Sequence, residues 1–142
     1  MKCSLVTNLT TLSKPITAND VDTFRTQFKE LLDESRDRHG IVYVWRTEND
    51  IPRLRGGSPV VYIGKTTNSL YDRYVSEIGW EAENYWGRYQ YIIETLGPIW
   101  FDIYETGNPE VTENRFLFQY QEAHMERPPI NIHAYKMSLP TS

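Results

Sequence analysis

The sequence predicts a single α+β domain: a small three-stranded antiparallel sheet with flanking helices, preceded by an N-terminal helix. Two observations predict this class. Three short runs rich in β-branched and aromatic residues lie at 41–45, 60–64 and 100–104. Segments in which apolar residues recur every three or four positions lie before, between and after these runs. With 142 residues, the chain is long enough for one domain with one core.

The N-terminal helix is predicted by an apolar stripe that begins after Asn19 and Asp20, either of which is a suitable N-cap. The stripe consists of Val21, Phe24, Phe28, Leu31 and Leu32. Gly40 is expected to end this helix. The Thr/Ser-rich segment before it has a weak pattern, with room for a short edge strand around Leu5 and Val6.

The runs at 41–45 and 60–64 are expected to form a hairpin, joined by a proline- and glycine-containing loop at 47–59. Side chains alternate between the two faces of a strand. Alternation assigns four aliphatic residues to the core face: Val42, Val44, Val61 and Ile63. It assigns Tyr43, Tyr62 and Gly64 to the opposite face, where a tyrosine hydroxyl can reach solvent or a ligand.

Three further helices are predicted. One covers 69–78 and ends at Gly79, and the next covers 83–96 and ends at Gly97. The last begins with Asn108 as cap and Pro109 in the first helical position, and it runs to about residue 126.

Composition excludes several classes of protein. Hydrophobic residues make up 39% and charged residues 24% of the chain, as in an ordinary globular domain. The single cysteine, Cys3, excludes an internal disulfide framework and a cysteine-based zinc site. The sequence has no apolar run long enough to span a membrane, and residues 1–7 lack the apolar core of a signal peptide. We therefore expect a cytoplasmic, intracellular protein with no membrane partner.

The charge is unevenly distributed. The net charge of −4 argues against a broad basic surface for nucleic acid. Residues 1–40 are neutral, residues 41–75 carry +2 and residues 76–142 carry −6. The middle segment is therefore the part where an electropositive site is expected.

Five short motifs follow one another between residues 40 and 131. They are Gly40-Ile41-Val42-Tyr43, Tyr62-Ile63-Gly64 followed by Lys65, Arg73 on the next predicted helix, Glu113 in Glu-x-x-Phe-Leu-x-x-Tyr, and Pro128-Pro129-Ile130-Asn131. In this order and on these element types, the motifs resemble the GIY-YIG nuclease family over about two thirds of the chain. The resemblance implies a GIY-YIG-like fold and a divalent-metal-dependent endonuclease that hydrolyses DNA, with RNA left open.

The resemblance also implies roles for the site residues. Arg73 offers a fork of donors that matches a phosphate, and Glu113 offers a hard oxygen ligand for one Mg²⁺ or Mn²⁺ ion. Tyr43 would position or deprotonate the attacking water, and its pKa would then have to be lowered by Lys65, Arg73 or the metal. Tyr62 would hydrogen-bond the phosphate or hold Tyr43.

Other residues are assigned supporting roles. Gly64 and Asn131 would support the site, with Asn131 tying the helix end to the hairpin. Arg46, Arg53 and Arg55 flank the hairpin loop and are candidates for contacts with a nucleic-acid backbone. The expected organisation is an N-terminal extension at 1–39 with a helix packed on the domain, a nuclease domain at 40–135 and a tail at 136–142. A homodimer is left open.

The motifs depart from the family pattern in four ways. Gly40 lies three residues before Tyr43 instead of two, and Arg73 lies eleven residues after Tyr62 where ten is common. Glu77 stands where some members carry a histidine, so either Glu77 takes over base or metal work or the water is activated differently. The long separation between Glu113 and Asn131 allows an alternative alignment with Gln119 in the glutamate's place; the spacing to the apolar positions of the motif favours Glu113.

Two other functions remain open at this stage. The altered spacings are compatible with a catalytically inactive module of the same fold that binds nucleic acid or a protein. The acidic C-terminal half is compatible with an inhibitor or adaptor that docks on a basic partner.

Overall fold

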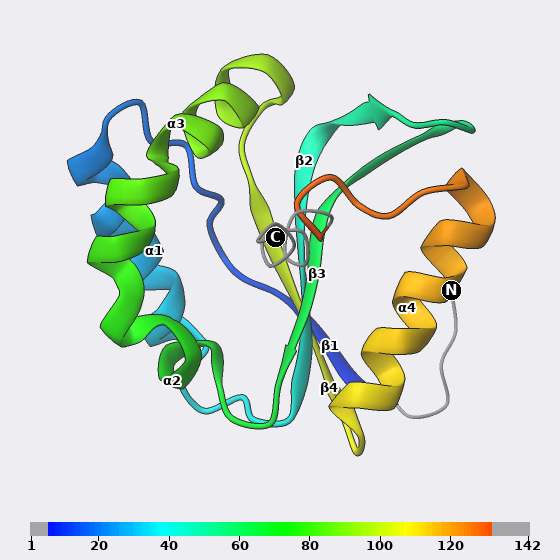
Figure 1. Cartoon of the computed structure of the whole chain (residues 1–142). Coiled ribbons are helices and arrows are strands. Elements are labelled where there is room, and N and C mark those ends of the chain that lie inside the picture. The colour runs from blue at the N-terminus through cyan, green and yellow to red at the C-terminus, as the bar shows by residue number, and fades with distance from the viewer. Residues whose placement is uncertain (1–5, 132–142) are drawn as a thin grey trace, which may run out of the picture.

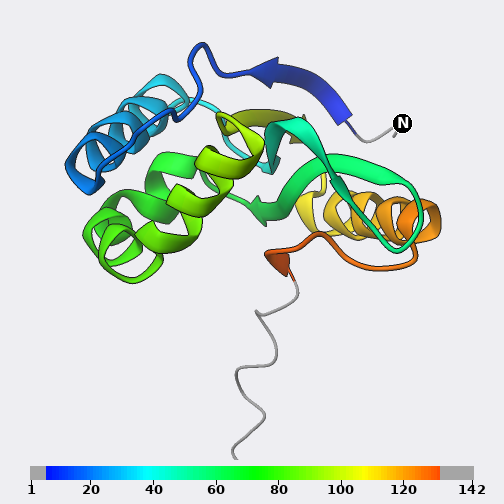
Figure 2. The same cartoon turned by 90° about the horizontal axis from the view of Figure 1, so that it is seen from above.

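The structure, a computed structural model, describes residues 6–131 and has an α+β architecture with helices on both faces of one antiparallel sheet (Figures 1 and 2). The sheet has the order β1-β4-β2-β3, with β1 at Val6–Thr11, β2 at Ile41–Pro52, β3 at Gly57–Thr66 and β4 at Trp100–Thr106. One face is covered by α1 (Val21–Glu34), α2 (Leu70–Tyr74) and α3 (Ile78–Leu96), and the other by α4 (Pro109–His124).

The sheet has four strands in the described residues, so the expectation of three strands was one short. The additional strand, β1, pairs with β4 at one edge of the sheet. Its apolar–polar alternation is weak because most of its residues are polar, which an edge strand with only one apolar face tolerates. The expected edge strand is present at Val6 and runs to Thr11, while Leu5 lies outside the described residues, as does the expected tail at 136–142.

The hairpin is longer than predicted. After an irregularity beyond Arg46, β2 and β3 pair again at Ile51–Ser58 and Pro52–Gly57, so most of the expected loop at 47–59 is strand and only residues 53–56 form the turn. Gly56 adopts a φ of +71°, and its carbonyl accepts a hydrogen bond from the Arg53 N–H at 2.9 Å. A two-stranded ribbon with polar residues on both faces gives no alternating pattern, which is why the sequence indicated a loop.

The helix ends follow local chemistry with two exceptions. The Asp20 and Asn108 caps are confirmed, because each side chain accepts a hydrogen bond from the backbone N–H three residues later. α1 ends at Glu34, before the predicted stop at Gly40, which instead leads into β2 with a φ of +67°. The predicted helix end at Gly79 was also wrong: a 3₁₀ turn, Val75–Glu77, separates α2 from α3. Gly79 lies inside α3 at the open surface, where its cost is limited to its low helix propensity.

The two faces of the sheet pack differently. Tyr43 and Trp45 point toward α1–α3 and belong to the larger core, with Phe28 and Phe101. Three residues on the opposite face pack against Phe116 of α4: Val42, Val44 and Ile63. The predicted division of faces is therefore correct for Val42, Val44 and Ile63 and for the two tyrosines, but the tyrosine face is a core rather than an open surface.

Val61 was assigned to the wrong face. Trp45 pairs with Tyr62 but Arg46 pairs with Val60, so Val61 is an extra residue in β3. Such a bulge interrupts the alternation of side chains. Val61 consequently packs into the larger core with the aromatic residues.

No helix in residues 6–131 combines the length and the apolar character that a membrane span requires.

Candidate active site

Tyr43 lies near the beginning of β2, directly opposite Gly64 of β3. Its side chain is 1% exposed, so the expectation that its hydroxyl reaches solvent was wrong; helices cover this face. The ring lies over Gly64 so closely that a Cβ there would come within 2.6 Å of two ring carbons. Gly64 therefore supports the site by leaving room for the Tyr43 ring.

The Tyr43 hydroxyl lies 3.3 Å from the hydroxyl of Tyr74 on α2. Burial raises the pKa of Tyr43, and this effect outweighs the Tyr74 hydrogen bond and the Arg73 charge, which both lower it. The expected role of Tyr43 as a base requires a lowered pKa, and the opposite shift is found. With these neighbours Tyr43 is a neutral phenol at neutral pH and can hold or position a group, but it is poorly suited to remove a proton.

Tyr62 lies beside Trp45, with ring centroids 5.2 Å apart, and is only partly buried. Burial raises its pKa as well, and the neighbouring Tyr43 raises it further. Tyr62 is the tyrosine of the hairpin that reaches the surface, because it lines two clefts on different sides of β3. Tyr62 therefore lies at the border of both clefts, and the charges of Arg73 and Glu113 both act on its phenol.

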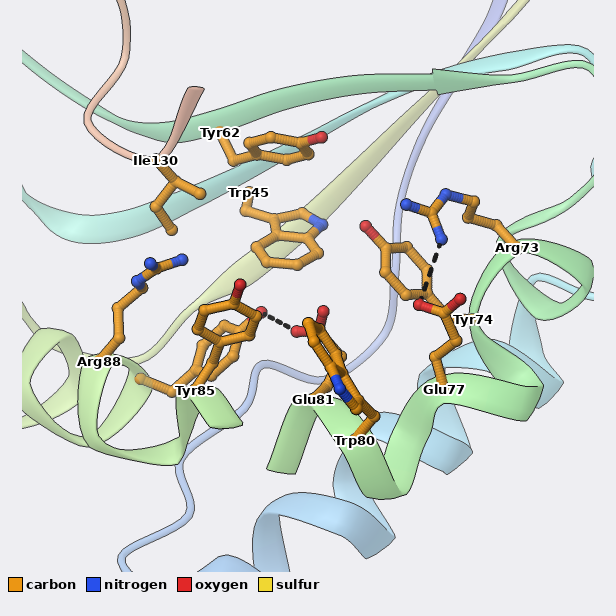
Figure 3. A pocket seen from close by; sticks show the side chains of 11 residues that line it. Trp45, Tyr62, Arg73, Tyr74, Glu77, Trp80, Glu81, Tyr85, Arg88 and Ile130 are labelled. Atoms are coloured by element: carbon orange, nitrogen blue, oxygen red, sulfur yellow. Dashed lines mark hydrogen bonds and ion pairs between the residues drawn. The ribbon is translucent and has the colours of Figure 1, made fainter. Parts of the chain in front are cut away.

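The first cleft, which we call the aromatic cleft, has a volume of about 370 Å³ and lies between the sheet and α2–α3 (Figure 3). Its lining residues are Trp45, Tyr62, Arg73, Tyr74, Glu77, Trp80, Glu81, Tyr85, Arg88, Tyr89 and Ile130. The sequence argument singled out three of them: Tyr62, Arg73 and Glu77. The aromatic residues of α3 were missed because their spacing resembles that of an ordinary buried helix face.

Arg73 is held at one end of the aromatic cleft by the short helix α2, whose N-cap Ser69 accepts a hydrogen bond from the Asp72 N–H at 3.1 Å. Its guanidinium lies 4.6 Å from the Tyr74 ring centroid and 3.6 Å from a Glu77 carboxylate oxygen. The Arg73 side chain is 43% exposed. It is therefore oriented by an aromatic face and a carboxylate while its donors remain accessible to an anion.

Glu113 lies in the second cleft, which we call the glutamate cleft and which has a volume of about 650 Å³. It is lined by Tyr62, Glu113, Asn114, Leu117, Phe118, Gln121, Arg127 and Asn131. Burial raises the pKa of Glu113, and the Lys65 ammonium, 3.9 Å from its Oε1, acts in the opposite direction. Gln119, the alternative to Glu113, is exposed and lines neither cleft. The geometry thus favours the alignment on Glu113.

Asn131 connects the segment after α4 to β3. Its side-chain oxygen accepts a hydrogen bond from the Ile63 N–H at 2.9 Å, and its side-chain amide donates to the Ile63 carbonyl at 2.8 Å. The expectation that Asn131 ties this segment to the hairpin is confirmed. Tyr62 and Gly64 flank the residue that Asn131 holds, so this contact also fixes the strand that carries them.

A divalent metal would have few protein ligands here. Within residues 6–131, no three His, Cys, Asp and Glu side chains come together as a metal-binding group. Glu113 fits the limited requirement of Mg²⁺, which keeps several waters and binds through one or two carboxylates together with substrate phosphates. Its carboxylate lines an open cleft, and Lys65 lies beyond hydrogen-bond distance of it. The donor set suits a substrate-assisted metal site and does not suit a closed protein cage.

The three hairpin arginines line neither cleft and contact other parts of the chain. Arg46 forms two hydrogen bonds with Asp102, of 2.7 and 3.2 Å. Arg53 Nη2 donates to the Arg127 carbonyl at 2.9 Å, and its Nε lies 3.0 Å from the Glu126 carboxylate. Arg55 donates to two carbonyls in the last turn of α4, those of Glu122 and Ala123. These guanidinium groups serve the fold, and contact with nucleic acid remains a prediction for them.

The structure thus brings Tyr43, Tyr62, Arg73 and Glu77 together on the helical side, and Lys65 and Glu113 on the α4 side. Arg73 and Glu113 both influence the ionisation of both tyrosines, and Tyr62 lines both clefts. The Arg73 guanidinium and the Glu113 carboxylate therefore both act on the Tyr62 phenol. Comparisons with family models, with curated proteins and with solved structures found no match to this chain.

Proposed function

We propose that this protein is a divalent-metal-dependent endonuclease of the GIY-YIG type, which hydrolyses DNA phosphodiester bonds where the aromatic cleft and the glutamate cleft meet at Tyr62. The observation that carries the proposal is the position of Tyr62. It lines both clefts, with Arg73 in one and Glu113 in the other. Phosphodiester cleavage needs positive charge on the phosphate and a carboxylate for the metal, and both border this hydroxyl.

In this proposal the phosphate binds between Arg73 and Tyr62. The guanidinium donates to phosphate oxygens, where negative charge increases in the transition state. The Tyr62 phenol stays protonated, because burial raises its pKa, and it donates a further hydrogen bond. Tyr43 lies behind them, and its hydroxyl and that of Tyr74 hold the cluster in one arrangement.

Glu113 would hold the metal ion, with the phosphate and water completing its coordination. When bound, the ion supplies positive charge to the phosphate and lowers the pKa of a bound water. The neighbouring Lys65 favours the ionised carboxylate that this role requires.

Glu77 is the proposed proton acceptor on the Arg73 side. It lies in the aromatic cleft, and its carboxylate is 3.6 Å from the Arg73 guanidinium. Water attacks phosphorus, the water's proton passes to Glu77, and the bond from phosphorus to the leaving sugar oxygen breaks as that oxygen takes a proton from solvent water. Tyr43, with its raised pKa, is less suited to this step.

The test is incubation of supercoiled plasmid with the protein and Mg²⁺ or Mn²⁺. We expect nicked and linear products from the wild type and none from Glu113→Gln or Arg73→Ala. The matched controls are Glu110→Gln, an exposed acid one turn earlier on α4, and Arg25→Ala, an exposed arginine on α1; both should cleave like the wild type. An inactive wild type, or equal activity in all four variants, would overturn the proposal.

A second candidate is a non-catalytic module that binds nucleic acid. The observation that favours it is the buried Tyr43, whose raised pKa removes the base that the family resemblance implies. Titration calorimetry with Mn²⁺ separates the two functions. Heat of binding that disappears in Glu113→Gln supports the nuclease, whereas DNA binding without any metal binding supports the module.

A further inference from the structure

Most of the aromatic cleft has no role in the proposed cleavage step. Arg73 and Glu77 occupy one end, while the walls further along consist of rings (Figure 3). Trp45 and Tyr62 come from the sheet, and Trp80 and Tyr85 come from α3. Trp80 is 53% exposed, and its ring centroid lies 5.3 Å from that of Tyr85. A large exposed ring in the wall of a cleft suggests a ligand with a flat face.

The charges divide the cleft into regions with different preferences. Arg73 and Arg88 lie at opposite ends, and Arg88 is stacked on Tyr85 at 4.4 Å from its ring centroid (Figure 3). Glu81 lies between them, and Glu77 lies beside Arg73 at its end of the cleft. A phosphate is favoured at either end and repelled in the middle, whereas a neutral ring with N–H groups is favoured in the middle. This pattern matches a nucleotide segment with its base between two phosphates.

Trp45 provides an independent observation. Its side chain is 3% exposed, and its indole Nε1 has no hydrogen-bond partner among the described residues. The nitrogen points toward the gap between Tyr62 and Tyr74 (Figure 3). A buried donor without an acceptor is costly, and because the surrounding rings shield this nitrogen, a ligand oxygen reaches it only when the Tyr62 or Tyr74 ring shifts.

We propose that the aromatic cleft is a nucleobase-binding site, which takes one base of a single-stranded or locally unpaired DNA segment. The base packs against Trp80 and Tyr85, and its flanking phosphates lie against Arg73 and Arg88. A base inside a duplex has no free face, so the site selects DNA whose bases are already unstacked. The inference rests on the proposed nuclease function and adds the class of substrate to it.

The experiment measures binding by fluorescence anisotropy, with EDTA present and at about 50 mM salt, so that affinities are comparable and cleavage does not interfere. The probes are a labelled thymidine oligonucleotide and a chain of abasic phosphates with the same length and charge. The variants are Trp80→Leu, which removes the ring, and Trp80→Phe, which keeps one. Tyr91→Leu is the matched control, because Tyr91 is an exposed aromatic residue of α3 that does not line this cleft.

We expect the wild type to bind the thymidine chain about fivefold or more tightly than the abasic chain. Trp80→Leu should lose that preference, while Trp80→Phe and Tyr91→Leu should keep most of it. Equal affinity of the wild type for the two chains would overturn the proposal and leave a protein segment as the better occupant. Unchanged preference in Trp80→Leu would also overturn it.

A parallel plasmid-cleavage assay separates this inference from the function on which it rests. Cleavage that depends on Arg73, together with binding that ignores the bases, contradicts the base site alone. Base-dependent binding without cleavage of any DNA in Mg²⁺ or Mn²⁺ contradicts the nuclease and supports the base site.

Discussion

The hairpin tip at residues 53–56 and the aromatic cleft both present arginines, and they use them differently. At the tip, Arg53 and Arg55 donate to backbone carbonyls at and beyond the end of α4, at 2.9 and 3.1 Å. In the cleft, Arg73 has a carboxylate partner only at 3.6 Å and remains 43% exposed. All three of these arginines lie in the segment 41–75, which carries a net charge of +2. Net charge therefore locates cations, but only their partners distinguish a cation that closes the fold from one that is accessible to a ligand.

The largest effect should come from the cleft. Arg73→Met should reduce DNA cleavage by about 10²–10³-fold, as when one donor to a charged transition state is removed. Its free energy of unfolding should change little, because an exposed ion pair contributes little to stability. Rates of plasmid nicking and urea denaturation of the same preparation check both statements. If Arg73→Met instead mainly lowers the free energy of unfolding, Arg73 stabilises the fold as Arg53 and Arg55 do.

The next largest effect is expected at Gly64, the β3 residue that packs directly against the Tyr43 ring. Gly64→Ala should destabilise the protein by about 1–3 kcal/mol, because the added Cβ would lie within 2.6 Å of the buried Tyr43 ring. The control is Gly87→Ala in α3, where a Cβ meets nothing within 4 Å. That substitution should stabilise the helix by about 0.5–1 kcal/mol. Urea denaturation of both variants measures the difference, and a stable Gly64→Ala would contradict the close packing.

At the tip, Arg53→Met should show the reverse of Arg73→Met. It removes a hydrogen bond to the Arg127 carbonyl and an ion pair with Glu126, and the side chain is 11% exposed. We expect a loss of about 1–2 kcal/mol in the free energy of unfolding. Affinity for DNA, measured well below the melting temperature, should stay unchanged. Weaker binding by the folded variant would restore Arg53 as a nucleic-acid contact.

The smallest effect concerns pH. Burial raises the pKa of Glu113 and Lys65 lowers it, so Lys65→Met should raise that pKa further. Cleavage requires the ionised carboxylate, so the acidic limb of its pH profile should move to higher pH in Lys65→Met. Lys29→Met, on α1, is the control and should leave the profile in place. An unmoved limb would indicate that another group sets it.

The raised pKa of Glu113 also determines how this residue affects stability as the pH changes. A carboxyl whose pKa is higher in the folded than in the unfolded state stabilises the fold below the unfolded pKa, and that contribution is lost as pH rises through the folded value. Glu113→Gln should therefore be more stable than the wild type at neutral pH. The difference should vanish under acidic conditions, and urea denaturation at several pH values tests this.

The parts of the fold that the sequence predicted well depend on contacts between neighbouring residues. The Asn108 cap with Pro109 behind it, and the Asp20 cap of α1, are local chemistry and were correct. The burial of Tyr43 depends on which face three helices cover, and the side of Val61 depends on a bulge. Neither is encoded in a short stretch of sequence, so both predictions failed.

The candidate site shows the same division. The sequence argument chose Glu113 over Gln119 from spacing alone, and the cleft favours that choice. It missed Tyr74, the hydrogen-bond partner of Tyr43, because a tyrosine on the apolar side of a helix resembles any core residue. Trp80 and Tyr85 were also missed, because they line a cleft only together with the sheet residues Trp45 and Tyr62 opposite them.

The contact of Asn131 with Ile63 also closes one border of the sheet. β3 is an outer strand, and the outward groups of such a strand invite pairing with another chain. Here the Ile63 N–H and carbonyl are bonded to Asn131, and the Val61 carbonyl accepts a hydrogen bond from the Ile130 N–H at 3.0 Å. This short segment imitates a neighbouring strand with one amide side chain and one peptide group. It protects the protein against edge-to-edge aggregation at the strand that carries Tyr62, while both clefts beside that tyrosine stay open.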